Sequence, residues 1–169
     1  MKIHSPGNWH VLYTRSKNEK KIAESLQREK IENYLPLRNV VTTVRNRKVK
    51  RSLPLFPSYL FVKINSSQEY LVTLNCLGAL YFLKSDGKVY SMDSSIIEDI
   101  KTITGESESF EVLHGLPKGQ KVRITGGAFE GLTGELVDFK GEKKVCVSVK
   151  VIERALLVTI CPSLIQIIH

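Results

Sequence analysis

The stretch PSYLFVKI, residues 57–64, is the clearest strand of the sequence. Tyr59 and Phe61 point to one face of this strand, because side chains alternate along an extended backbone. Leu60 and Val62 point to the opposite face, so both faces carry large apolar groups. The stretch therefore predicts a sheet strand that makes contacts on both faces, in contrast to a surface strand with one polar face.

Strands and helices alternate through the rest of the first 103 residues. Ser16 and Glu19 have the spacing of a capping box, which predicts the start of an amphipathic helix over residues 17–30. Asp86-Gly87 predicts a tight hairpin turn. The other predicted elements are strands at 9–14, 80–83 and 89–90, an extended segment at 34–37, and helices at 66–75 and 93–103. This order predicts an α+β fold in which helices cover one antiparallel sheet.

The remaining part of the sequence is rich in short β patterns. Residues 104–115 are polar and acidic, and we interpret them as a linker. Residues 116–169 contain five short apolar alternations separated by glycine-rich turns, which is typical of a small closed β-barrel. The predicted domains are therefore 1–103 and 116–169.

The net charge of +8 lies entirely in the first domain. Residues 1–103 hold 17 Lys and Arg against 9 Asp and Glu, whereas residues 104–169 hold 8 of each. This asymmetry predicts that the first domain faces a polyanion. The cations gather in two segments: residues 38–53, with Arg38, Arg45, Arg47, Lys48, Lys50 and Arg51 and no acid, and the start of the first helix, with Arg15, Lys17, Lys20 and Lys21.

Valines interleave with the cations of residues 38–53, so this segment is predicted to be either an exposed hairpin or a mobile loop. A basic surface that serves solubility would show the same composition. The pattern indicates a polyanion and does not distinguish DNA from RNA.

Aromatic residues form a second notable pattern in the first domain. A sheet covered on one side can bury only some of the rings that its strands carry, so the others predict an exposed aromatic patch of the kind found at protein interfaces. Ordinary core packing is an alternative. Base stacking is another, although the usual signature of RNA-binding sheets is missing. The rings concerned are Tyr13, Phe56, Tyr59, Phe61, Tyr81 and Phe82.

No pattern of residues indicates an active site. The four histidines have no second ligand at metal-binding spacing, and the three cysteines form no CxxC pair. The glycines at 126–134 lack the Lys and Ser/Thr of a phosphate-binding loop. We therefore expect neither an enzyme nor a metal or cofactor site.

The sequence also lacks membrane and export signals. No apolar run approaches the roughly 20 residues of a membrane span. The opening MKIHSPGNWH lacks the apolar stretch of a signal peptide. We expect a cytoplasmic protein that acts as a monomer and does not bind membranes.

Several motifs together resemble the NusG-type transcription elongation factors. WHVLYT at 9–14, the helix with Glu19-Lys20-Lys21, YLP at 34–36 and PLFPSYLFV at 54–62 resemble their N-terminal domain. VRITGGAFEGLTGEL at 122–136 resembles their C-terminal KOW motif, which implies an SH3-like barrel. The compact chain, without an acidic insertion, is more similar to the specialised RfaH-like and UpxY-like paralogues that regulate polysaccharide operons than to the housekeeping factor.

The resemblance implies that the first domain binds RNA polymerase and suppresses pausing or termination. In this family an aromatic cavity grips the clamp of the polymerase, and the matching positions are Tyr13, Phe56, Pro57, Tyr59 and Phe61. RfaH-like members contact the displaced non-template DNA strand at the start of the first helix. The nucleic-acid contacts predicted from both basic segments are Arg15, Asn18, Lys20, Lys21, Arg45, Arg47 and Lys48.

The sequence differs from the family pattern at two places in the first domain. Ser16 replaces a basic residue of the family, and Tyr70-Leu71-Val72 replaces a His-Thr-Thr that touches the far side of the polymerase cleft. A second polymerase contact at residues 70–72 must then be apolar, or lie elsewhere. The KOW turn consists of Gly126, Gly127, Phe129, Gly131 and Gly134.

The resemblance also implies a partner for the KOW domain. A small-subunit ribosomal protein or Rho would bind around Ile152 and Arg154, and we expect Ile152 to be exposed. The many β-branched residues of 145–152 favour a barrel over a helical form. A free-standing RNA- or ribosome-binding KOW protein is the alternative, which the zero net charge of residues 104–169 disfavours.

Overall fold

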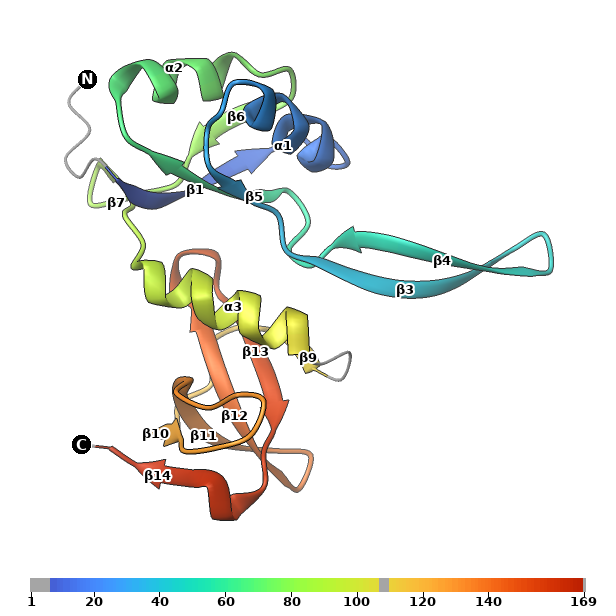
Figure 1. Ribbon diagram of the computed structural model, residues 1–169, viewed down its shortest axis with the longest axis vertical. Coiled ribbons are helices and arrows are strands. Elements are labelled where there is room, and N and C mark those ends of the chain that lie inside the picture. The colour runs from blue at the N-terminus through green and yellow to red at the C-terminus, as the bar shows by residue number, and fades with distance from the viewer. Residues whose placement is uncertain (1–6, 107–109, 169) are drawn as a thin grey trace. The chain divides into compact units, whose positions relative to one another are not determined.

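The computed structural model describes residues 7–106 and 110–168 (Figure 1). The chain forms two compact units, Met1–Ser94 and Ser95–His169. The first unit is a small sheet with two helices, and the second contains one helix and a larger sheet. The α+β class that the order of elements predicted is confirmed.

The first unit is built on a four-stranded antiparallel sheet in the order β2-β5-β1-β6. Leu12 lies opposite Leu60 where β1 pairs with β5, and Tyr34 lies opposite Phe61 where β2 pairs with β5. The stretch 57–64 thus supplies an inner strand. The four strands are β1 (Asn8–Thr14), β2 (Asn33–Tyr34), β5 (Tyr59–Ile64) and β6 (Ala79–Phe82).

Helices α1 (Glu19–Arg28) and α2 (Ser67–Asn75) cover one face of this sheet. Ile22 and Leu26 of α1 are buried against it, and each such side chain contributes about 1.5–3 kcal/mol by leaving water. We call the covered side the helix face; its strand residues are His10, Leu12, Leu60, Val62, Ile64 and Phe82. The alternate residues form the tyrosine face, which carries Trp9, Val11, Tyr13, Tyr59, Phe61 and Tyr81.

Helix α1 begins at Glu19, two residues later than predicted, because the capping box does not form. Lys17 has a left-handed φ of 66°, and the N-cap residue Asn18 makes no side-chain capping bond. The Glu19 carboxylate leaves the helix and accepts a hydrogen bond from the backbone N–H of Ser58 at 2.7 Å. The capping box of Ser16 and Glu19 was therefore a wrong prediction. By contrast, α2 begins as expected, with the Ser66 hydroxyl accepting the Glu69 N–H.

The basic segment is a hairpin, which selects one of the two predicted alternatives. β3 (Leu37–Val44) pairs with β4 (Arg47–Pro54) over eight residue pairs and extends from the first unit as a separate two-stranded ribbon (Figure 1). Arg45 and Asn46 at its tip have φ of 49° and 60°, as a two-residue type I′ turn requires. The turn at Asp86-Gly87 likewise joins β7 (Lys84–Ser85) to β8 (Lys88–Val89), as predicted.

The second unit holds a six-stranded antiparallel sheet in the order β14-β10-β11-β12-β13-β9. Its helix α3 (Ser94–Glu106) carries the predicted apolar stripe, because Ile97, Ile100 and Ile103 are fully buried. The strands are β9 (Phe110–His114), β10 (Gln120–Ile124), β11 (Thr133–Phe139), β12 (Glu142–Val149), β13 (Arg154–Thr159) and β14 (Ile165–Ile167), with 3₁₀ turns at Lys150–Ile152 and Pro162–Leu164.

Part of the predicted linker 104–115 is regular structure. Residues 104–106 end α3, and Phe110–His114 form β9, a strand that pairs with β13. Ion pairs hold β9 in place: Glu111 reaches across β13 to Lys144 of β12 and also pairs with Lys140 at 3.6 Å. The Lys144 ammonium lowers the pKa of Glu111, and the Glu111 carboxylate raises the pKa of Lys144. Residues 116–169 hold the five predicted strands, β10 to β14, and β9 from the predicted linker adds a sixth strand to the sheet.

Candidate functional site

Three tyrosines lie side by side across the tyrosine face. Tyr13 on β1 lies opposite Tyr59 on β5 and opposite Tyr81 on β6. The ring of Tyr13 is 5.4 Å from that of Tyr59 and 5.2 Å from that of Tyr81, measured between centroids. Tyr81 is 53% exposed, and the other two rings are half-buried. We call these three residues the tyrosine row; it is a preformed aromatic surface with hydroxyl groups that tolerate water.

The phenylalanines of the same face lie beneath the surface. Phe56 and Phe61 are at most 1% exposed and pack edge to face, with ring centroids 6.1 Å apart. Tyr34 stacks on the other side of Phe61 at 6.4 Å. These two rings therefore follow the core-packing alternative and are not part of an exposed patch. Their position supports the row, because the Phe56 carbonyl accepts the N–H of Tyr59 at 3.2 Å while Pro57 stays exposed.

The same loop is fastened to the start of α1. Glu19 is only 2% exposed, although glutamate in the first turn of a helix normally faces water. Its carboxylate accepts the Ser58 N–H, and the Ser58 carbonyl accepts the N–H of Thr14 at 2.9 Å. Ser58 has a left-handed φ of 68°, a strained conformation that this pair of bonds stabilises. Glu19 thereby fixes the residue that precedes Tyr59, a role that sequence reasoning missed by assigning Glu19 to a capping box.

The basic start of α1 is exposed as predicted. Arg15 and Lys21 are solvent-exposed, and Asn18 is half-buried. Lys20 is also exposed, but its ammonium donates to the backbone oxygen of Ser52 in β4 at 2.7 Å. The structure thus brings the helix start and the base of the hairpin together. At the far end of the hairpin Arg45, Arg47 and Lys48 are exposed.

The predicted second polymerase contact is not one continuous surface. Tyr70 stacks on Phe82 at 4.9 Å and packs against the helix-face core together with Val72. Leu71 points away from that core and is 60% exposed. Residues 70–72 lie on a helix, so neighbours in sequence diverge by about 100°. Leu71 is therefore the member of this set that is available to a partner.

Glycines shape the KOW turn for two different reasons. Gly127 and Gly131 have φ of 81° and 85°, which side chains rarely adopt. Gly134 has no such φ, but a Cβ there would lie 2.5 Å from the carbonyl oxygen of Cys146. Phe129 is half-buried, and Gly126 has no positive φ. Four of the predicted turn residues thus lie between β10 and β11, and Gly134 lies in β11 opposite Val122.

Ile152 does not fit its predicted role as an exposed contact. It is 4% exposed, because β12 ends at Val149 and the 3₁₀ turn Lys150–Ile152 ends the period-two alternation on which the prediction rested. Arg154 is half-buried, and its guanidinium donates to the carbonyls of Ile152 at 3.2 Å and Glu153 at 3.0 Å. Arg154 therefore secures the turn that buries Ile152.

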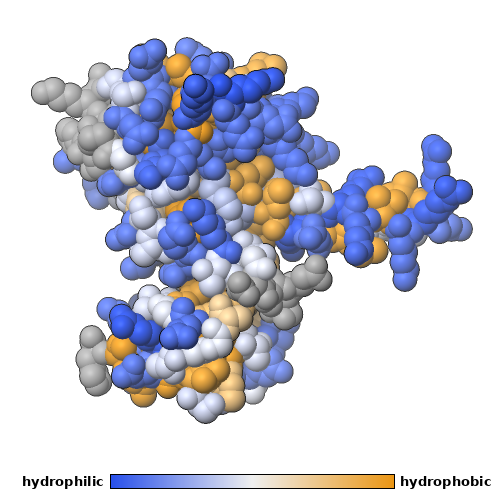
Figure 2. Space-filling view, in the orientation of Figure 1, coloured by the Kyte–Doolittle hydropathy of each residue, from blue (hydrophilic) through white to orange (hydrophobic). Residues whose placement is uncertain are grey.

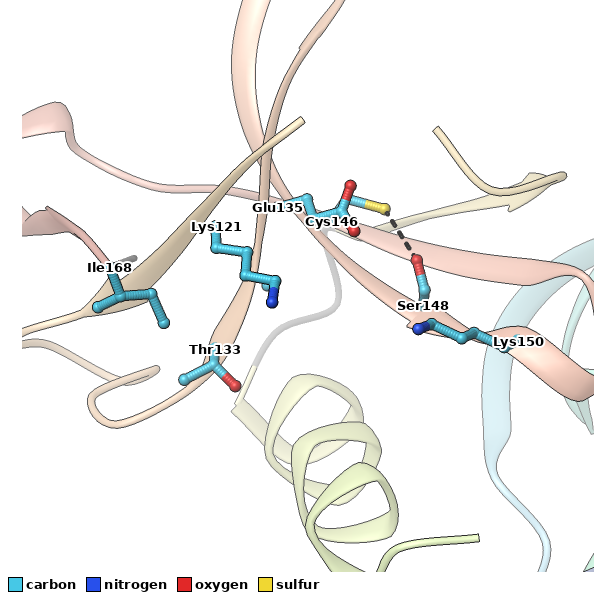
Figure 3. A pocket seen from close by; sticks show the side chains of 8 residues that line it. Lys121, Thr133, Glu135, Cys146, Ser148, Lys150 and Ile168 are labelled. Carbon is cyan, nitrogen blue, oxygen red and sulfur yellow. Dashed lines mark hydrogen bonds between the residues drawn. The ribbon is translucent and has the colours of Figure 1, made fainter. Parts of the chain in front are cut away.

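The second unit also contains an open cavity of about 340 Å³ on the outer side of β10, β11 and β12 (Figure 3). Lys121, Thr133, Ser148 and Lys150 are among the residues that line it. The Cys146 thiol lies 3.8 Å from the Ser148 hydroxyl, and burial raises the pKa of that thiol. A thiol held in its protonated form is a poor nucleophile.

The described residues contain neither a metal-binding cluster nor a membrane-spanning helix. Across residues 7–106 and 110–168, no group of three or more His, Cys, Asp or Glu side chains is arranged to hold a metal ion. No helix in these residues has both the length and the apolar character needed to cross a bilayer.

Comparison with known proteins agrees with this geometry. The family model described as "Transcription termination factor nusG" matches residues 7–101. The transcription termination/antitermination protein NusG of Rickettsia felis is 28% identical over 155 residues, covering 83% of this chain and 81% of that protein. NusG of Lactococcus lactis is 26% identical and covers 80% of each chain.

A solved structure shows the same fold. The chain in "Domain interaction in Thermotoga maritima NusG" aligns with 96% of this chain and 97% of its own length, at a TM-score of 0.54 and 22% identity. The matched residues 7–101 span more than half of the 169 residues and include the tyrosine row, the Glu19 contact and the basic hairpin. This chain belongs to the NusG family of transcription termination and antitermination factors.

Proposed function

We propose that this protein binds the clamp of RNA polymerase through the tyrosine row and suppresses pausing or termination. The observation that carries the proposal is the row itself: Tyr13, Tyr59 and Tyr81 form one surface on the sheet face that α1 and α2 leave uncovered. Aromatic side chains of this kind dominate binding energy at protein interfaces. The family's other docking positions are Phe56, Pro57 and Phe61. The two phenylalanines are buried and support the row from beneath, whereas Pro57 is exposed.

Binding of this kind can alter elongation without any chemical step. A factor that prefers the closed polymerase disfavours the open, paused state in proportion to its differential affinity. A coupling of about 1–3 kcal/mol lowers the paused fraction by roughly 5–150-fold. The second contact, on the far side of the cleft, is assigned to Leu71, the exposed member of residues 70–72.

The basic start of α1 is proposed to hold the displaced non-template DNA strand. Arg15, Lys20 and Lys21 are exposed there, and cations at a helix N-terminus are unfavourable for the helix itself. Their presence is therefore better explained by a ligand than by helix stability. Asn18 beside them adds a polar contact.

A specialised role in one operon is the finer part of the proposal. It rests on the compact chain and on Ser16, which replaces a basic residue of the family and points to a different DNA preference. The replacement at residues 70–72 concerns the second polymerase contact instead. A ribosomal protein or Rho would meet the second unit near Arg154, with Ile152 beneath the surface. Deleting the gene and sequencing all transcripts tests this role: one affected operon supports it, and a genome-wide change in pausing contradicts it.

The docking proposal is tested by capture of RNA polymerase. The double variant Tyr13→Ala and Tyr59→Ala removes two adjacent rings, and we expect at least about a 100-fold loss of polymerase affinity. Ile167→Ala is the control, because Ile167 is an exposed apolar residue of the second unit, at 49%, and is not part of the tyrosine row. Retained capture by a double variant that is still folded would refute the docking assignment.

A further inference from the structure

The β3–β4 hairpin separates its arginines from its lysines. Residues that lie opposite each other in an antiparallel pair point to the same side, and the side alternates along each strand. The register pairs Arg38 with Leu53, Val40 with Arg51, Thr42 with Val49 and Val44 with Arg47. It pairs Asn39 with Ser52, Val41 with Lys50 and Thr43 with Lys48. Three arginines thus share one side, the arginine face, and both lysines share the other.

All of these cations are available to a ligand. Arg38, Arg47 and Arg51 are exposed, and no carboxylate of the described residues lies within ion-pair distance of any of them. Six unpaired positive charges on a ribbon of 18 residues repel one another. No ion pair among the described residues offsets this repulsion. The charges are therefore better explained by an anionic ligand that binds the ribbon.

The two faces of the hairpin differ in the number of cations that they carry and in the residues around those cations. The arginine face interleaves its guanidinium groups with Val40, Val44, Val49 and Leu53, and Figure 2 shows hydrophobic and hydrophilic patches alternating along the projecting ribbon. Guanidinium is less strongly hydrated than ammonium and binds phosphate through two parallel hydrogen bonds. It therefore tolerates the partial drying that the neighbouring apolar groups impose. The lysine face is less apolar: its exposed lysines lie among Asn39, Thr43 and Ser52, with Val41 opposite Lys50.

We propose that the arginine face of β3–β4 binds duplex DNA, with the lysine face turned to solvent. A two-stranded ribbon fits the major groove, which is about 12 Å wide. Arg47 and Arg51 are four residues apart, so they stand about 13 Å from each other along the ribbon and reach the phosphates on both sides of the groove. The valines between them suit the apolar edge that thymine methyl groups present there.

The composition of the ribbon selects a duplex over a single strand. Proteins that hold single strands stack the bases on aromatic side chains. Residues 37–54 contain no aromatic residue, whereas the tyrosine row lies elsewhere on the first unit. The proposal rests on the proposed function in one respect: a factor bound to an elongating polymerase has duplex DNA beside it.

The test compares two variants of the full chain that lose the same charge from different faces. One carries Arg38→Gln, Arg47→Gln and Arg51→Gln from the arginine face. The other carries Lys48→Gln and Lys50→Gln from the lysine face, together with Arg45→Gln from the turn so that the charge lost is equal. Fluorescence anisotropy measures binding to a labelled duplex of about two helical turns and to one of its single strands, between about 50 and 200 mM salt. Circular dichroism confirms that each variant is folded.

We expect the arginine-face variant to lose at least about tenfold in duplex affinity and to lower the slope of log affinity against log salt by about 2–3, since each phosphate contact contributes about 0.9. The other variant should change the slope by less than about 1. Replacing the three arginines by lysine should also weaken binding, because the charge stays and the paired hydrogen bonds are lost. Equal losses from both faces, or tighter binding of the single strand by the parent chain, would overturn the proposal.

Polymerase capture separates this proposal from the proposed function. Both hairpin variants retain the tyrosine row, so both should capture RNA polymerase as the parent chain does. Loss of duplex binding with capture intact supports the arginine face. Intact capture together with equal duplex affinity in the parent and both variants refutes the arginine face and leaves the docking proposal standing.

Discussion

The two faces of the four-stranded sheet are built from the same strands but serve different ends. On the helix face, Leu12, Leu60 and Val62 are fully buried beneath α1 and α2. On the tyrosine face, Phe61 is equally buried, yet Tyr13, Tyr59 and Tyr81 stay in contact with solvent. Adjacent residues such as Tyr59 and Leu60 therefore have separate tasks, which are assigned by the two-residue period of a strand. Burial on one face stabilises the fold, and incomplete burial on the other leaves a surface for a partner.

The strongest test of this difference is a pair of substitutions at neighbouring positions. Leu60→Ala removes a buried side chain from the helix face, and we expect it to cost about 2–5 kcal/mol of unfolding free energy because a cavity remains. Tyr59→Ala should cost clearly less, since its ring is already half in water. Urea unfolding followed by the fluorescence of Trp9, the single tryptophan, measures both.

Polymerase capture should show the opposite order, with the larger loss for Tyr59→Ala than for Leu60→Ala. Tyr59→Ala should bind RNA polymerase weakly while it is folded, and Leu60→Ala should bind normally below its unfolding midpoint. If both variants lose stability and capture in the same proportion, the two faces are not functionally distinct.

A second, smaller effect is expected at Glu19, which links the helix face to the tyrosine face. Glu19→Ala leaves the half-buried N–H of Ser58 without its acceptor, which costs about 1 kcal/mol. Glu19→Gln is the matched control, because its amide oxygen can still accept this bond without charge. We expect capture to fall for Glu19→Ala and to recover largely for Glu19→Gln. Identical capture by the two variants would show that the Ser58 bond does not position the row.

The sequence predicted which face of the sheet each side chain points to, but it did not predict how deeply each side chain is buried. The alternation at residues 57–64 correctly separated Tyr59 and Phe61 from Leu60 and Val62. It could not show that Phe61 would be sealed by Phe56 and Tyr34, because that depends on chain segments distant in sequence. The hairpin turn and the apolar stripe of α3 were local patterns and were found. The docking and nucleic-acid assignments themselves stay predictions.

Two of the wrong predictions share one cause, which is that a local pattern competed with a distant partner, whereas the third has a local cause. The capping box failed because Ser58, 39 residues away, binds Glu19. The predicted linker overlapped a strand because Glu111 pairs with Lys144, 33 residues away. Ile152 was placed on the wrong side because a 3₁₀ turn follows β12. The tyrosine beside Tyr13 on β6, Tyr81, was counted among the rings but not among the docking residues, although the pairing of 9–14 with 80–83 would have indicated it.

Protonation of a residue on the helix face should also make the stability of the fold depend on pH. No such effect is expected from the tyrosine face. His10 is buried there at 3% exposure, its Nδ1 donates to the Tyr90 carbonyl at 2.8 Å, and its Nε2 has no partner among the described residues. Burial lowers the pKa of His10 below 6.5. The unfolded chain therefore binds the proton more tightly, so stability is complete above about pH 6.5 and is lost as the pH falls toward the folded-state pKa.

Unfolding midpoints in urea at about pH 7.5 and 5.5 measure this effect, since histidine titrates in that range. His10→Phe should flatten the dependence while lowering stability at neutral pH through loss of the Tyr90 bond. Tyr13→Phe, on the other face, serves as the control and should leave the dependence as it is. An unchanged pH dependence in His10→Phe would show that His10 is not the titrating group.

The smallest effect on stability is expected at Tyr81, where a loss of binding can be distinguished most clearly from a loss of stability. Its ring is more than half exposed on the outer strand β6, so Tyr81→Ala should change the unfolding free energy by no more than about 0.5 kcal/mol. If the row is a docking surface, the same substitution should still weaken polymerase capture by roughly 5–30-fold, the loss of about 1–2 kcal/mol that a contact at the edge of an aromatic patch contributes. Tyr81→Phe keeps the ring and should bind nearly as well as the parent chain. A variant that loses binding without losing stability identifies a residue kept for a partner, whereas loss of neither would restrict the docking surface to Tyr13 and Tyr59.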